Sequence, residues 1–210
     1  MPDLHLDCKF APMDEDAFLT IENSGEGYFK SKGSRFISFA IPVKDEEEID
    51  FHLKAIKRQY ADATHHCFGW SLGRQRERYR YYDDGEPSGT AGRPIYGQIL
   101  SAGITNVLIV VVRYYGGTKL GTSGLIEAYK TAASEAIGKV AKITGYEIKS
   151  LYLEFDYSSM EVVMRKIKQY KFQIAESEYG EKCFIHLKVR KSFYDSAVEI
   201  FSDVNGIVVR

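Results

Sequence analysis

The stretch VLIVVVRYYGGTKLGTSG, residues 107–124, contains the pattern that decides the fold. Its first six residues are all apolar with no polar alternation, so a strand here must be buried on both faces, as a central strand is. Glycines interrupt the run, and apolar residues then recur at helical spacing over about 123–138. We therefore expect a central strand over 107–114, a glycine-rich loop and a helix.

A second glycine-rich stretch, DDGEPSGTAGRP, occupies residues 83–94. Nine of the chain's 18 glycines fall between residues 85 and 124. Glycine loses more conformational freedom on folding than any other residue. Loops so rich in it indicate a backbone shaped for close approach, either to another part of the chain or to a ligand.

The rest of the chain alternates strand and helix patterns, which indicates an α+β protein. Strands are expected over about 18–31, 34–43, 64–70 and 76–82, and helices over about 45–60 and 93–102. Beyond residue 150 the order is strand, helix, strand, strand, helix, strand, which is a ferredoxin-like βαββαβ unit. A capping box at Ser158 and Glu161 is expected to begin its first helix.

These patterns divide the chain of 210 residues into three parts. Residues 1–17 form an acidic lead-in, residues 18–140 an N-terminal domain and residues 146–210 a C-terminal domain, with a linker around 139–145. The net charge is −1, so bulk charge does not mark a nucleic-acid binder. We find no signal peptide and no apolar run long enough for a bilayer, and the three cysteines form no CxxC pair. A cytoplasmic protein without a membrane partner is expected.

The loop that follows the central strand has the context of a phosphate site, between an apolar strand and a helix. Lys119 is followed by Leu120, however, so the nucleotide-triphosphatase order of glycine, lysine and Ser/Thr is absent. Contact with an anion or an RNA phosphate remains open. The alternative is a tight turn with a helix N-cap at Thr122 or Ser123.

Other polar groups have competing interpretations. Asp83, Asp84 and Glu86 could hold a hard cation, but aspartate and glycine also form turns, which favours a structural loop. His65 and Cys67 share one face of a strand, and two ligands do not make a zinc site. No metal, cofactor or catalytic residue is therefore expected.

One local concentration of basic residues interleaves arginines with tyrosines: Arg74, Arg76, Arg78, Tyr79, Arg80, Tyr81 and Tyr82. Arginines beside aromatic rings suit phosphate contact and base stacking. A solvated hairpin with acidic partners is an equal alternative.

The two glycine-rich motifs, with the histidine-cysteine strand at 65–67, resemble the YigZ/IMPACT family over about residues 18–210. The resemblance implies an N-terminal domain with a left-handed βαβ fold like domain IV of elongation factor G. It also implies a ferredoxin-like C-terminal domain, and a role in regulating translation or binding RNA or ribosome-associated partners. Eukaryotic members carry an extra N-terminal partner-binding domain and act on a stress kinase through that kinase's coactivator. This chain has only a short acidic lead-in where that domain would be.

We therefore expect a non-enzymatic protein that associates with RNA or the ribosome, of open oligomeric state. The expected phosphate-binding residues are Arg76, Arg78, Arg93, Arg113 and Lys119, and the expected loop surface is Asp84, Glu86, Ser88, Tyr114, Gly116 and Gly117. One alternative is an enzyme acting on a small phosphorylated or nucleotide substrate, which predicts that Asp84, Glu86, Arg93 and Lys119 converge in a pocket. The other is a protein-interaction module.

Overall fold

A computed structural model describes residues 15–210, and these form two compact units. One unit comprises Phe18–Gly145, and the other comprises Tyr146–Arg210 with residues 15–17. Each is an α+β arrangement, as the sequence predicted. The expected lead-in lies mostly outside the described residues. Within the described part, no helix is long and apolar enough to cross a membrane.

The first unit is built on a five-stranded sheet with β6 at its centre. In spatial order its strands are β2 (Gly25–Ser31), β3 (Ser34–Pro42), β6 (Val107–Tyr114), β4 (His65–Leu72) and β5 (Arg78–Tyr82). β6 is antiparallel to both of its neighbours. The unbroken apolar run from 107 to 112 thus forms the central strand that it predicts.

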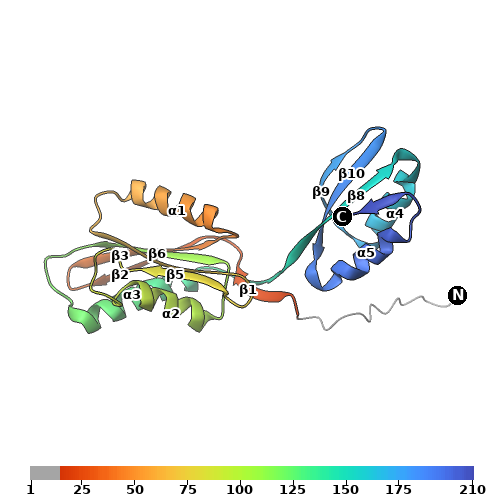
Figure 1. Cartoon of the computed structure of the whole chain (residues 1–210). Helices are drawn as coiled ribbons and strands as arrows, with labels where there is room; N and C mark the ends of the chain where they lie inside the picture. The colour runs from red at the N-terminus through yellow and green to blue at the C-terminus, as the bar shows by residue number, and fades with distance from the viewer. Residues whose placement is uncertain (1–14) are drawn as a thin grey trace. The chain divides into compact units, whose positions relative to one another are not determined.

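Helices cover both faces of this sheet (Figure 1). α1 (Glu46–Gln59) lies on one face, and α2 (Gly92–Ala102) and α3 (Gly121–Gly138) lie on the other. Alternate residues of β6 serve two separate cores, because successive side chains of a strand point to opposite faces. Val107, Ile109 and Val111 pack with α2 and α3, whereas Leu108, Val110 and Val112 pack with α1.

A two-stranded sheet pairs β1 (Ala17–Ile21) with β7 (Lys142–Tyr146). The expectation of a linker around 139–145 is therefore wrong for its second half, which is a strand. The pattern missed it because its residues are mostly exposed and show no apolar alternation.

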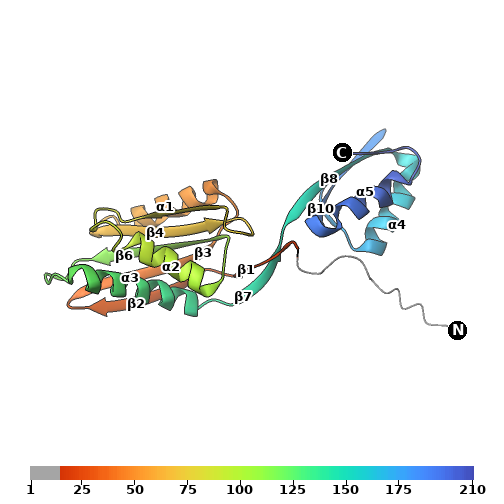
Figure 2. The ribbon, with the colours of Figure 1, turned by 60° about the horizontal axis from the view of Figure 1, so that its bottom comes forward.

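The second unit has the ferredoxin-like order expected from the sequence. Its sheet runs β11 (Ile207–Val209), β8 (Ile148–Asp156), β10 (Lys182–Arg190) and β9 (Gln173–Glu178). α4 (Met160–Tyr170) and α5 (Tyr194–Ser202) pack on one face of it (Figure 2). The capping-box prediction is wrong, because a 3-10 turn over Tyr157–Ser159 leads into α4 and no side chain caps its start.

Candidate functional site

The topology of the first unit brings both glycine-rich loops to one end of its sheet. β6 finishes at Tyr114, and α3 begins shortly after it. α2 leads back to the start of β6, so α2 also begins at the end where β6 finishes. On the neighbouring strands, Arg35 lies opposite Tyr114 and His65 opposite Arg113. We call this the loop end: the ends of these strands, residues 83–93 and residues 113–122.

A buried ion pair joins the two loops. Nη1 of Arg113 donates to Oε1 of Glu86 at 2.5 Å, and both side chains are almost fully buried. The Tyr129 hydroxyl on α3 donates to the same oxygen at 2.7 Å. Nη2 of Arg113 donates to the Ser34 hydroxyl at 3.2 Å. Burying a charge is costly unless the charge is paired. Separating Glu86 from Arg113 would leave both charges buried and unpaired, so this network holds the loop against the sheet.

The two aspartates of the first loop also make structural bonds. Asp83 accepts from the backbone N–H groups of Ala91 and Gly92 at 3.0 and 2.8 Å, so its carboxylate caps the start of α2. Asp84 accepts from the backbone N–H of His66 at 2.6 Å. A carboxylate near a helix start is favoured by the helix dipole. These groups therefore shape the loop, as turn-forming aspartates do.

The thiol of Cys67 lies inside the same network. It donates to the backbone carbonyl of Asp83 at 3.1 Å and lies 3.3 Å from the Tyr129 hydroxyl. Burial raises the pKa of the Cys67 thiol and the pKa of the Tyr129 phenol well above their usual ranges. A thiol held in its neutral form is a poor nucleophile, so this cysteine is a packing residue.

The second loop makes its close approach to the chain itself. A Cβ placed on Gly116 would lie 1.9 Å from the carbonyl carbon of Gly33, in the β2–β3 turn. Gly117 is different: its φ is +82°, and a Cβ there would meet nothing within 4 Å. The first glycine thus permits two backbones to touch, whereas the second satisfies a left-handed turn that faces open space.

Three exposed cations lie at the loop end. Arg93 and Lys119 are exposed, one in the first turn of α2 and the other just before α3. Arg35 is also exposed, and its guanidinium lies 4.7 Å from the centre of the Tyr114 ring. Sequence analysis missed Arg35, although its place after the Gly33 turn puts it opposite the end of the central strand.

The start of α3 has no side-chain cap. The helix begins at Gly121 after Leu120, so the N-cap at Thr122 or Ser123 that the alternative interpretation required is not formed. No acidic residue lies in its first turn, and Thr122 and Ser123 are exposed. N–H groups at a helix start favour an anion, and Lys119 stands immediately beside them.

The other predicted phosphate-binding residues do not lie together on the surface of the loop end. Arg78 lies opposite Leu72, at the other end of the sheet, and pairs with Glu46 of α1. Nε of Arg76 donates to the carbonyl of Ile104 at 3.1 Å. Arg113 is buried, so its guanidinium is enclosed by protein. Of the five predicted phosphate-binding residues, only Arg93 and Lys119 are exposed at the loop end.

The residues predicted to form the loop surface differ in their exposure to solvent. Ser88 and Gly117 are exposed, and Gly116 is half-buried. The Tyr114 hydroxyl donates to Asp62 at 2.7 Å. Glu86 is buried, and Asp84 is half-buried.

The convergence that the enzyme hypothesis predicts is not observed. Glu86 is held by Arg113 and Tyr129, and Asp84 is held by a backbone N–H. Among residues 15–210, no group of three or more histidine, cysteine or carboxylate side chains is arranged to hold a metal ion. The loop end therefore presents exposed cations, together with acids that are engaged in internal bonds.

Comparison with known proteins identifies the family. The Impact N-terminal domain model matches residues 32–137. The chain is 31% identical over 195 residues to the IMPACT family member YvyE of Bacillus subtilis (strain 168), covering 91% of this chain and 90% of the relative. It is 31% identical over 160 residues to the IMPACT family member YigZ of Escherichia coli (strain K12), covering 75% and 78%. The chain therefore belongs to the IMPACT family.

A solved structure shares the fold. The crystal structure of a hypothetical protein matches with a TM-score of 0.72 at 25% identity, covering 92% of this chain and 96% of its own.

Proposed function

We propose that this chain is a cytoplasmic RNA- or ribosome-associated protein that takes part in regulating translation. In this proposal the loop end contacts phosphate groups of the RNA backbone. The role in translation comes from the family resemblance. The phosphate contact comes from the site: Lys119, Arg93 and Arg35 are exposed there, beside the uncapped start of α3.

The observation that carries the proposal is that the nearby acids are engaged in internal bonds. Glu86 lies against Arg113, and Asp83 and Asp84 accept backbone N–H groups. Glu86 is buried and the two aspartates are half-buried, whereas Lys119, Arg93 and Arg35 are exposed. An approaching phosphate would therefore meet positive side chains and helix N–H groups, which favour anions.

The proposal favours RNA over a small phosphorylated substrate. The chemistry of an enzyme needs an acid or base within reach of its substrate. The acidic side chains of residues 83–86 are engaged in structural bonds. Phosphate contacts that position a nucleic-acid backbone need no such group.

The test is binding of a fluorescein-labelled single-stranded RNA to the full chain, measured by anisotropy. Lys119→Ala and Arg93→Ala are each expected to weaken binding about threefold, because each removes one phosphate contact. Lys139→Ala is the matched control, since this exposed lysine lies at the opposite end of α3, about 27 Å away along the helix. Equal affinity of all three variants and the unaltered chain would refute the placement of the site.

A further inference from the structure

We propose that the open face of the C-terminal sheet is a docking surface for a protein segment bearing arginine and lysine side chains. This face is the one opposite α4 and α5. The proposal concerns a second surface and does not depend on phosphate contacts at the loop end.

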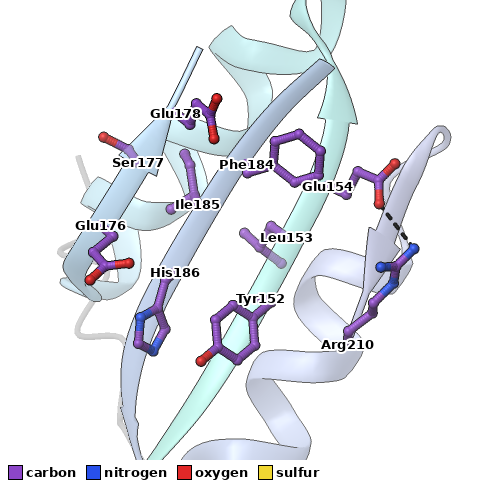
Figure 3. Close-up of a pocket in the computed structure, with 10 residues that line it drawn as sticks. All are labelled: Tyr152, Leu153, Glu154, Glu176, Ser177, Glu178, Phe184, Ile185, His186 and Arg210. Carbon is purple, nitrogen blue, oxygen red and sulfur yellow. Dashed lines mark ion pairs between the residues drawn. The ribbon is translucent and has the colours of Figure 1, made fainter. Parts of the chain in front are cut away.

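The register of the four strands places its side chains in two transverse rows. β8 pairs with β10 and β11, and β10 pairs with β9, so residues in register stand side by side across the sheet. The first row is Val208, Glu154, Phe184 and Glu178, and the second row is Arg210, Tyr152, His186 and Glu176. Apart from Val208, the side chains of these rows line a hollow of about 600 Å³. Figure 3 labels these lining side chains.

The centre of the two rows is aromatic and exposed. Tyr152 retains 50% of its surface and Phe184 retains 43%. The rings of Tyr152 and His186 stack with centroids 4.4 Å apart. Contiguous exposed apolar surface of this kind is typical of an interaction site. The faces of these rings also attract cations, and arginine in particular stacks on them.

The pairing of charged side chains on this face differs between its two edges. Next to β11, Arg210 pairs with Glu154 at 3.0 Å. Lys182, which lies on β10, pairs with the same carboxylate at 3.1 Å. On the β9 side, Glu176 and Glu178 are exposed, and no ion pair is found for either among residues 15–210. The edge next to the aromatic centre is therefore acidic.

Exposed aromatic rings beside an acidic edge indicate which kind of partner can bind this face. A cationic side chain can lie over Tyr152 or Phe184 and extend its charge to Glu176 or Glu178. β9 is also an edge strand, and an extended segment can pair with such an edge through its main chain. An RNA strand could stack its bases on the same rings, but Glu176 and Glu178 would repel its phosphates. Charge complementarity therefore favours a basic protein segment over RNA.

The experiment is a titration of the ¹⁵N-labelled full chain with a blocked peptide of alternating arginine and glycine, followed by amide chemical shifts. We expect shifts that saturate and are confined to β8, β9, β10 and β11. The double variant Glu176→Gln/Glu178→Gln should weaken binding about fivefold, because two surface ion pairs are lost. Tyr152→Ala should weaken it by a similar factor.

Matched controls are Glu199→Gln on α5 and Tyr157→Ala after β8, two exposed side chains outside the two rows. Neither should change the affinity. The proposal would be overturned if the peptide caused no shifts in the four strands, or if the Glu176→Gln/Glu178→Gln variant bound the peptide as tightly as the unaltered chain. It would also be overturned if an oligouridylate shifted the same amides and bound more tightly than the peptide.

Discussion

Oε1 of Glu86 lies 2.5 Å from Nη1 of Arg113 in the interior of the N-terminal unit. The two residues belong to different glycine-rich motifs, and the bond between them joins the two motifs. Nε of Arg113 has no hydrogen-bond partner among the described residues. The guanidinium is thus held mainly by Glu86 and Ser34, and it depends on the carboxylate for its neutralisation.

Breaking this pair should destabilise the N-terminal unit strongly. Glu86→Ala leaves a buried guanidinium without its counter-charge, and we expect the free energy of unfolding to fall by about 3–5 kcal/mol. The single tryptophan, Trp70, is buried in this unit, so its fluorescence during urea unfolding reports the change. Glu127→Ala, at an exposed position of α3, should shift stability by less than about 0.5 kcal/mol.

The double variant Glu86→Leu/Arg113→Met separates charge from packing. Removing both partners leaves no isolated buried charge, so its loss should be smaller than that of Glu86→Ala. A double variant less stable than Glu86→Ala would contradict the view that the counter-charge matters most.

The close contact between Gly116 and Gly33 leads to a second prediction. Gly116→Ala would place a methyl group against the Gly33 backbone, which cannot yield as a side chain does. We expect a loss of more than about 2 kcal/mol, again followed by Trp70 fluorescence. Gly97→Ala is the control, because a Cβ there meets nothing within 4 Å and the residue lies inside α2. That change should instead stabilise the unit by about 0.5–1 kcal/mol.

The C-terminal unit contains a pH-dependent anchor. Arg190 donates to Asp16 at 2.6 Å, Ser192 also donates to it, and these bonds lower the pKa of Asp16 from 3.8 to about 2. A carboxyl with a lowered pKa stabilises the folded state above its unfolded pKa, and this contribution is lost as pH falls from about 4 to about 2. Asp16→Asn should therefore cost about 1–2 kcal/mol at pH 7.

This cost should disappear near pH 2. Amide hydrogen exchange of β8 and β10 measures it, because these strands form the core of that unit. A deficit of equal size at pH 7 and pH 2 would show that Asp16 acts through packing rather than through its charge.

Much of the fold follows from local pattern. The apolar run at 107–112 identifies the central strand, and the strand and helix order after residue 150 identifies the ferredoxin-like unit. Hydrophobic periodicity reports which faces are buried, and this information survives in a single sequence. β7 was missed because its exposed residues leave no such signal.

The partners of the charged residues could not be predicted in the same way. Glu86 and Arg113 are 27 residues apart, and Asp16 and Arg190 are 174 apart. Which charges meet is decided by strand order and register rather than by local spacing. For this reason the sequence predicted Arg113 as a phosphate-binding residue, whereas the structure buries it in an ion pair with Glu86. The same limit applies to Arg78, whose position at the far end of β5 follows from the register with β4.

The most direct test of phosphate contact at the loop end is the salt dependence of RNA binding. The logarithm of the affinity for a single-stranded RNA should fall linearly with the logarithm of salt concentration, because each phosphate contact releases counterions. For the variant Arg93→Ala/Lys119→Ala, the slope should be shallower by about 1.4, since about 0.7 is lost per contact to a single strand. An unchanged slope in that variant, with RNA still bound, would contradict the account.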